Sequence, residues 1–310
     1  MTNARKLVRW ITPFVVTAAA VSYLLSTIDM GGVIEHLDLH AAAVLIPALL
    51  AFGAVSLVLE ALSLTRLARP ERGRLDFVTA ARIKAASYPL ALLHYALGTG
   101  GLALLLSRRS GNGLADALGV VVLISLFDMA MQLLMVVTGV ALLGSDLVVM
   151  RAGVVIATVA AFLGGFAVLR APISLGSFDR IRNLSLFAAA RTTPVHLLLQ
   201  LGLLRLLFAL SFISLAQAAL YAFDLPVPFG HLIVGIPLLV VVSLIPAVAG
   251  LGPGQIAFVE IFSRWGDDET LLACSLALSA GLIVLRASIG LAFAREFTRE
   301  AMTEVREAEA

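Results

Sequence analysis

Several charged side chains lie inside long apolar stretches of this chain, and four of them could form a binding site: Asp128, Arg205, Glu260 and Arg286. An ionisable group inside a membrane-spanning segment is costly, so it is by default a candidate for function. The two arginines carry planar guanidinium groups that suit bidentate contacts with a phosphate. As alternatives, Arg205 could pair structurally with a carboxylate such as Asp128, and Glu260 could be exposed or interfacial.

Two apolar stretches are interrupted by glycines. One reads Gly98-Thr99-Gly100-Gly101, and the other reads Gly250-Leu251-Gly252-Pro253-Gly254. Proline and glycine interrupt helical hydrogen bonds, and lipid offers no replacement partners, so such backbone persists only within protein or beside a water-filled cavity. A helix that resumes at Gln255 would point its N-terminal amides at the second break, where a phosphate is stabilised. For the first break, close helix packing is an equal alternative.

The candidate binding residues are therefore drawn from the charged residues and from the two breaks. They are Gly98, Gly101, Asp128, Arg205, Gly250, Gly252, Gly254, Gln255, Glu260 and Arg286. By contrast, Glu60 and Asp116 are expected near the ends of spans and without a role, and Lys84 belongs to a basic loop that orients the chain.

The composition places these residues in a membrane. Of the 310 residues 60% are hydrophobic and only 14% are charged, and the mean hydropathy is +1.02. A soluble domain would carry far more charge, so we expect an all-α polytopic membrane protein. The single cysteine, Cys274, excludes a disulfide within the chain. The sequence has no nucleotide-binding, zinc-protease or serine-hydrolase motif, which favours a non-enzymatic protein without a cofactor, a metal or a nucleic-acid partner.

Stretches of about 20 apolar residues predict six full spans, at residues 10–28, 39–64, 114–143, 152–169, 195–223 and 271–294. Most of the 22 Lys and Arg residues fall in the N-terminus, in two basic loops, in the turn at Arg108 and Arg109, and in the tail at residues 296–310. The positive-inside rule assigns these segments to the cytoplasm. We therefore expect a bacterial inner-membrane protein with both termini in the cytoplasm.

This orientation leaves two apolar segments that cannot be simple crossings. Residues 88–106 must enter from the cytoplasm, turn at residues 98–101 and leave on the same side. Residues 231–265 must enter from outside and turn near residues 250–254. The halves 1–145 and 146–295 of a single transmembrane domain then form an inverted-topology repeat. Paired interruptions of this kind indicate a transport site between the repeats.

Several short motifs resemble the membrane region of the lysylphosphatidylglycerol synthase/flippase family. They are Ile83-Lys84, Tyr95-Ala96-Leu97-Gly98-Thr99-Gly100-Gly101, Ser107-Arg108-Arg109-Ser110-Gly111, Leu126-Phe127-Asp128, Ile245-Pro246 and Gly250-Leu251-Gly252-Pro253-Gly254-Gln255. Asp128 matches the mid-span aspartate of the family. Pro253, Gly254 and Gln255 stand where the family has Val-Arg-Glu, and the first break lacks the charged residues of the family.

The resemblance implies movement of an anionic or aminoacylated lipid between leaflets, without the soluble aminoacyl-transferase domain of bifunctional members. The partner would be a membrane phospholipid or an isoprenoid-type lipid, and a homo-oligomer is possible. Its phosphate would be held between the two breaks by the helix N-terminus at residues 252–255, with Arg205 and Arg286. Two alternatives stay open: a lipid-modifying transferase with Asp128 or Glu260 as base, and a small-solute transporter with the same repeat.

Overall fold

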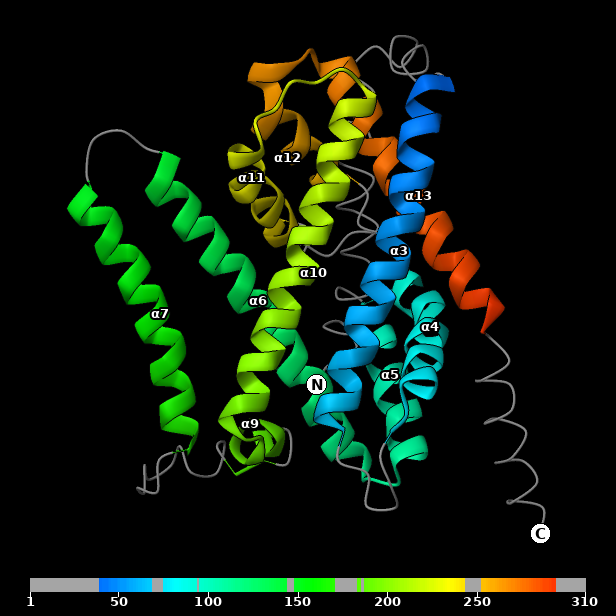
Figure 1. The fold of residues 1–310 in the computed structure, drawn as a ribbon, viewed down its shortest axis with the longest axis vertical. Coiled ribbons are helices and arrows are strands. Elements are labelled where there is room, and N and C mark those ends of the chain that lie inside the picture. The colour runs from blue at the N-terminus through cyan, green and yellow to red at the C-terminus, as the bar shows by residue number, and fades with distance from the viewer. Residues whose placement is uncertain are drawn as a thin grey trace, which may run out of the picture. The chain divides into compact units, whose positions relative to one another are not determined.

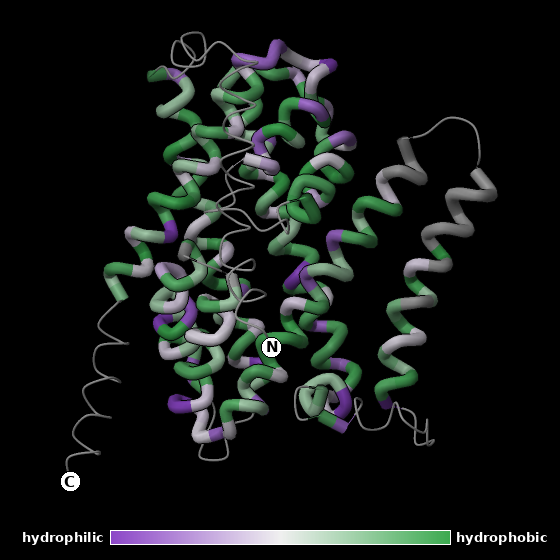
Figure 2. Tube along the Cα trace, turned by 180° about the vertical axis from the view of Figure 1, so that it is seen from behind, coloured by the Kyte–Doolittle hydropathy of each residue, from purple (hydrophilic) through white to green (hydrophobic). Residues whose placement is uncertain are grey.

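A computed structural model of the chain describes residues 39–68, 75–93, 95–143, 148–170, 183–184, 187–242 and 252–293. The regular structure of these residues is entirely helical. Four of the helices are long and apolar enough to cross a membrane, and the hydropathy colouring of Figure 2 shows that most of their length is hydrophobic. The prediction of an all-α membrane protein is confirmed at this level.

The four long helices are α3 (Leu39–Leu67), α6 (Leu114–Leu143), α10 (Val195–Ala222) and α13 (Asp268–Ala292) (Figure 1). Each coincides with a predicted span. The span predicted at residues 152–169 falls in α7 (Val148–Arg170), of which residues 158–170 form a shorter apolar helix. The span predicted at residues 10–28 lies outside the described residues, so a total of six spans stays a prediction.

The helices form two compact units. Unit 1 takes its described residues from Met1–Phe52, Met135–Asp146 and Ser211–Leu285. Unit 2 takes them from Gly53–Leu134, Leu147–Leu210 and Arg286–Ala310. Both units draw on all four long helices, unit 1 also contains α11 and α12, and the other described helices belong to unit 2.

In unit 2 the shorter pair is α4 (Phe77–Leu93) and α5 (Tyr95–Ser110). A Cβ atom added to Gly98 would lie 2.5 Å from the Cβ of Ala91. Residues seven apart in one continuous helix are separated by about 10 Å along the axis, so α5 must fold back along α4, as Figure 1 shows. The two helices therefore form a hairpin that is tightly packed at Gly98.

The position of this turn corrects the sequence prediction. The interruption was expected at residues 98–101, but these residues lie inside α5, and the two helices are separated at residue 94. Glycine in a helix interior costs only about 1 kcal/mol relative to alanine, and the close approach that Gly98 permits offsets that cost. Gly98 therefore serves close helix packing, which was the alternative interpretation of these glycines.

This packing makes Gly98→Ala a sensitive test of the hairpin. The added methyl group would clash with both the side chain and the backbone of Ala91, and overpacking of this kind costs about 1–3 kcal/mol. We expect Gly98→Ala to lower the thermal unfolding midpoint in detergent. Gly100→Ala in the same helix is the matched control, because nothing lies within 4 Å of its added Cβ, and we expect an equal or higher midpoint. Equal midpoints for both variants would contradict the packing.

Unit 1 contains a second hairpin, formed by α11 (Phe229–Val242), α12 (Pro253–Phe262) and the short 3-10 turn η3 (Ser263–Trp265). The rings of His231 and Trp265 are 4.9 Å apart, edge to face. A Cβ atom added to Gly235 would lie 2.8 Å from the ring of Phe262. The start of α11 thus lies against the end of α12, which agrees with the predicted fold-back of residues 231–265. Residues 243–251, including Gly250, lie outside the described residues.

The start of α13 is capped by Asp267. Its carboxylate accepts hydrogen bonds from the backbone N–H and the hydroxyl of Thr270, both at 2.9 Å. The backbone N–H bond lowers the pKa of Asp267 below its ordinary value, because it stabilises the ionised form. A depressed pKa in the folded state adds stability above the unfolded pKa, and this stability is lost as the pH falls through the folded pKa.

We therefore expect Asp267→Ala to lower the free energy of unfolding by about 1 kcal/mol at neutral pH, the usual value of a helix N-cap. The deficit relative to wild type should shrink as the pH falls below about 4, the ordinary range of the Asp pKa. Asp267→Asn is the control, because asparagine caps helices equally well but does not titrate. Denaturant unfolding at several pH values measures both variants, and a deficit that is independent of pH would contradict this origin of the stability.

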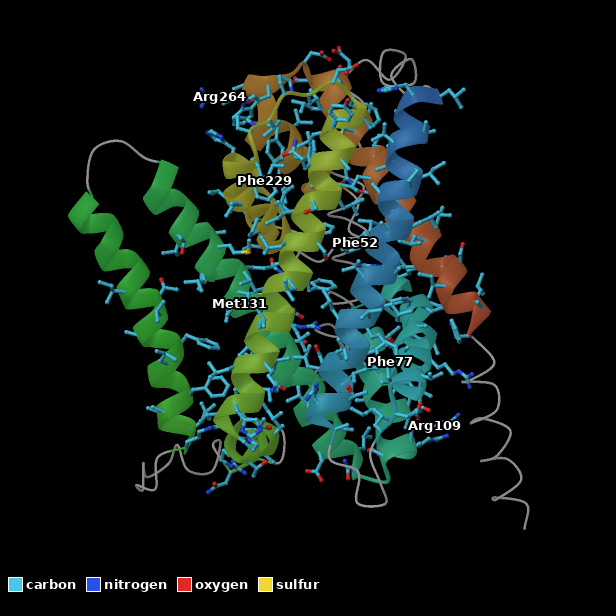
Figure 3. The ribbon with its side chains drawn as sticks, viewed as in Figure 1. Phe52, Phe77, Arg109, Met131, Phe229 and Arg264 are labelled. Atoms are coloured by element: carbon cyan, nitrogen blue, oxygen red, sulfur yellow. The ribbon has the colours of Figure 1, made fainter. Side chains whose placement is uncertain are left out.

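Several of the described basic residues of unit 2 gather at one end of it. The end of α3, the start of α4, the end of α5 and the start of α6 lie together at the bottom of Figure 1. This end carries Arg66 in the last turn of α3, and Arg108 and Arg109 in the last turn of α5, where Figure 3 labels Arg109. Arg170 ends α7 and donates hydrogen bonds to the carbonyl oxygens of Ala190 and Thr193. The unit therefore has one strongly cationic end.

The interior of unit 1 is apolar and rich in aromatic contacts. Phe52 of α3, labelled in Figure 3, has its ring centroid 5.6 Å from that of Phe212 of α10. Phe258 and Phe262 of α12 pack edge to face at 4.9 Å. These contacts join α3 to α10 and stabilise α12 within unit 1.

Candidate binding cavity in unit 2

A cavity of about 180 Å³ lies inside unit 2. All the described residues that line it belong to this unit and come from α3, α4, α5, α6, α10 and α13. Its volume is well above the roughly 15 Å³ that one buried water needs, so it admits a polar group of several heavy atoms. Its walls carry five charged side chains, which are Glu60, Lys84, Asp128, Arg205 and Arg286.

Arg205 of α10 is the most deeply buried of these residues, with an exposed fraction of 1%. Its Nη1 atom lies 3.5 Å from a carboxylate oxygen of Asp128 on α6. Its Nη2 donates to the carbonyl oxygen of Leu59 at 3.1 Å and to the hydroxyl of Ser63 at 2.5 Å, both on α3. This guanidinium therefore ties α3, α6 and α10 together. The ion pair with Asp128 is the structural alternative that the sequence left open.

Not every donor of Arg205 is used. Its buried Nε has no hydrogen-bond partner among the described residues, and its guanidinium lies 5.3 Å from the ring of Phe208. A buried N–H without a partner carries a free-energy cost. Local conflicts of this kind in an otherwise well-packed region are typical of functional sites.

A second ion pair also lines the cavity. Lys84 of α4 places its Nζ 2.9 Å from Glu60 of α3, and the Tyr88 hydroxyl donates to the other oxygen of the same carboxylate at 2.9 Å. Lys84 and Tyr88 are four residues apart, so they share one face of α4. Both carboxylates of the cavity are thus held by a cation.

Arg286 of α13 is the cation that remains. It lines the cavity and is partly exposed. Among the described residues it makes no ion pair or hydrogen bond. When both carboxylates are ionised, the five charged side chains carry a net charge of +1 that resides on Arg286. An arginine in this position can bind a carboxylate or a phosphate with two parallel hydrogen bonds.

The structure brings four of the predicted site residues to this one cavity, namely Gly98, Asp128, Arg205 and Arg286. Gly101 lies in α5 but does not line the cavity. Gly252, Gly254, Gln255 and Glu260 belong to unit 1, and Gly250 lies outside the described residues. The idea of one cavity shared by both interruptions therefore stays a prediction.

The polar groups at the second interruption are largely engaged within unit 1. Gly252 has a φ of 109°, which suits glycine, and its N–H donates to the side-chain oxygen of Gln255 at 2.5 Å. The side-chain nitrogen of Gln255 donates to the hydroxyl of Ser279 on α13 at 3.1 Å. Gln255 is buried, so its side chain caps α12 and links it to α13. Glu260 is exposed on α12, which matches its alternative interpretation.

Sequence reasoning missed three residues of the cavity. The sequence predicts Glu60 at a span end without a role and Lys84 in a basic loop, and it gives no site prediction for Tyr88. A usable signal was present, because Lys84 and Tyr88 share one helix face and Glu60 interrupts an otherwise apolar run. A carboxylate there requires a partner, and a lysine beside an amphipathic tyrosine is a natural one.

No family model, curated protein or solved structure matches this chain. The described residues also contain no group of three His, Cys, Asp or Glu side chains that could hold a metal ion. The site must therefore be interpreted from its own geometry: a cavity inside apolar helices, two internal ion pairs and one further arginine.

Proposed function

We propose that the protein is a membrane lipid translocase of the flippase type, and that this cavity admits the anionic headgroup of its lipid. One observation carries the proposal. A cavity lined by five charged side chains lies within helices that are long and apolar enough to span a membrane. Because charge at such a depth is costly, its natural use is to bind a polar group that must pass through the apolar layer. Arg286 would bind the phosphate.

The positions of the charged residues along their helices support a headgroup that enters from the cytoplasmic side. Glu60 lies seven residues before the end of α3, Arg205 ten residues after the start of α10, and Arg286 six residues before the end of α13. These intervals correspond to about 9–15 Å of helix. All three helix ends belong to the side that the positive-inside rule assigns to the cytoplasm. The cavity would thus serve the inner leaflet of a bacterial inner membrane.

The two hairpins support an alternating mechanism. In this proposal α4–α5 is a re-entrant element entered from the cytoplasm, and α11–α12 is its counterpart entered from outside. A helix of the length of α4, 17 residues, extends about 25 Å, which is short of the ~30 Å hydrocarbon core. One hairpin in each half of the chain, residues 1–145 and 146–295, is the arrangement expected of an inverted repeat that exposes a site alternately to the two sides. The resemblance to the lysylphosphatidylglycerol synthase/flippase family, with Asp128 in the cavity, favours the same activity.

The proposal is tested by reconstituting the full chain into liposomes that contain lipids with fluorescent acyl chains. A membrane-impermeant reductant bleaches the outer leaflet, and the remaining fluorescence reports exchange between leaflets. We expect faster exchange of an anionic lipid in proteoliposomes than in protein-free liposomes. Equal exchange for several anionic lipids would contradict translocation. Conversion of the probe to a new lipid species would instead support the transferase, and uptake of a solute without lipid exchange would support the solute transporter.

A further inference from the structure

We infer that the cavity selects a phosphodiester headgroup that carries one negative charge, bears hydroxyl groups and lacks an amine. This inference rests on the proposed function, because it names the class of headgroup that the same cavity would take. The observations behind it are the charge balance of the cavity, the hydrogen bonds of its hydroxyl groups and its volume.

The charge balance determines the charge of the ligand. Glu60 is within ion-pair distance of Lys84, and Asp128 is within ion-pair distance of Arg205. Arg286 then leaves one positive charge without a counter-charge among the described residues. A singly charged phosphodiester would neutralise it. A doubly charged phosphomonoester would leave an excess negative charge in a poorly solvated space, which is unfavourable.

The same charges disfavour an amine. An ammonium group in this cavity would meet three cationic side chains, Lys84, Arg205 and Arg286. Both carboxylates of the cavity already have cationic partners, so the ammonium would have to displace one of them. Like charges repel strongly where water is scarce. A zwitterionic or aminoacylated headgroup should therefore bind more weakly than an amine-free one.

The hydroxyl groups of the cavity indicate what else the headgroup carries. The hydroxyl of Ser87 donates to the carbonyl oxygen of Lys84 at 2.7 Å. A serine whose proton is used in this way keeps acceptor lone pairs on its oxygen. This acceptor suits a hydroxyl group of a bound ligand, such as one of a glycerol or a sugar. The cavity therefore offers a guanidinium for the phosphate and an acceptor for a hydroxyl group.

The volume limits what enters. At about 180 Å³ the cavity can take a small headgroup, but not the acyl chains of a lipid, which would remain among the apolar faces of the helices. A free glycerol phosphate would satisfy the same polar contacts without the chains, but it is a phosphomonoester and carries more charge at neutral pH. A binding experiment can therefore separate a lipid headgroup from a free anion.

The test measures binding to the full chain in detergent with three soluble probes. They are a short-chain lipid with a glycerol phosphodiester headgroup, the same lipid with an ethanolamine headgroup, and free glycerol 1-phosphate. We expect the glycerol lipid to bind on the order of ten- to hundredfold more tightly than the ethanolamine lipid, because the three cations of the cavity repel the ammonium group of the latter. Equal or tighter binding of the ethanolamine lipid would overturn the inference. Tighter binding of glycerol 1-phosphate than of the glycerol lipid would overturn it too.

Arg286→Gln tests whether Arg286 supplies the positive charge that binds the phosphate. This variant should lose the preference for the glycerol lipid, Arg286→Lys should keep part of it, and Arg264→Gln, an exposed arginine of unit 1, should keep all of it. An unchanged preference in Arg286→Gln would overturn the role of Arg286. Because the comparison of probes with the wild-type protein needs no variant, the inference is decided even if Arg286→Gln does not fold.

The failure of this inference can be distinguished from that of the proposed function. If the glycerol and ethanolamine lipids bind equally and are exchanged equally in proteoliposomes, the proposed translocation stands and the headgroup selectivity is overturned. If the glycerol lipid binds selectively but no lipid is exchanged, the headgroup site stands and the proposed translocation is overturned.

Discussion

Replacing Arg205 with methionine should lower the free energy of unfolding by about 3 kcal/mol, near the lower end of the range for breaking a buried ion pair. The guanidinium is 1% exposed and contacts Asp128, Leu59 and Ser63 on two other helices. Its loss leaves the Asp128 carboxylate without a cation and the Leu59 carbonyl without one of its donors. The Asp128 side chain is 31% exposed, so solvent relieves part of the cost of its unpaired charge. We therefore expect a loss of stability near the lower end of this range.

The double variant Arg205→Met/Asp128→Asn separates charge from packing. It removes the uncompensated carboxylate, so we expect it to be more stable than Arg205→Met alone. Arg264→Met in unit 1 is the matched control, because its arginine is exposed and rests on the ring of Trp265; a surface change of this kind stays within about 0.5 kcal/mol. Unfolding in mixed detergent micelles measures all three. If the double variant were no more stable than Arg205→Met, an ion pair at this position would be contradicted.

The helices could be predicted because apolar length is a local property. The predicted span at residues 195–223 and the observed α10, Val195–Ala222, differ by a single residue at one end. The fold-back of residues 231–265 was also predictable, since a proline and three glycines interrupt an apolar run and the flanking charge pattern leaves no room for a full crossing. The first hairpin was predicted at residues 88–106 with its turn at residues 98–101, but the observed helices α4 and α5 extend over Phe77–Leu93 and Tyr95–Ser110, so about half of α4 falls in the predicted basic loop. Glycine signals both a turn and a close helix contact, and the sequence alone does not distinguish them.

The cavity depends on contacts that no local pattern encodes. Arg205 reaches Leu59 and Ser63, which precede it by 146 and 142 residues. The long helices have apolar residues on all their faces, so their sequences give little indication of which face is buried. The sequence therefore identified Asp128, Arg205 and Arg286 as charged residues in apolar surroundings. The sequence also indicates that Glu60 needs a cationic partner, but whether this pair meets Arg205 and Asp128 depends on how α3 is rotated against α4.

Replacing Ser125 with leucine should reduce lipid exchange roughly tenfold or more, because an exclusion of 1–3 kcal/mol corresponds to about that change. Ser125 of α6 lines the cavity beside Asp128, and its hydroxyl bonds locally to the Val121 carbonyl. Leucine places three more carbon atoms into a space of about 180 Å³. It leaves both ion pairs intact, so the protein should fold.

Ser214→Leu is the matched control for this variant. It makes the same chemical change on α10 of unit 1, where the serine is exposed, so exchange should stay at the wild-type rate. Leaflet exchange in proteoliposomes measures activity, and the thermal midpoint in detergent verifies that both variants are folded. A folded Ser125→Leu protein that exchanges lipid at the wild-type rate would remove this cavity from the path of the headgroup. A loss in Ser125→Leu alone would place the headgroup in the cavity of unit 2, beside its two ion pairs.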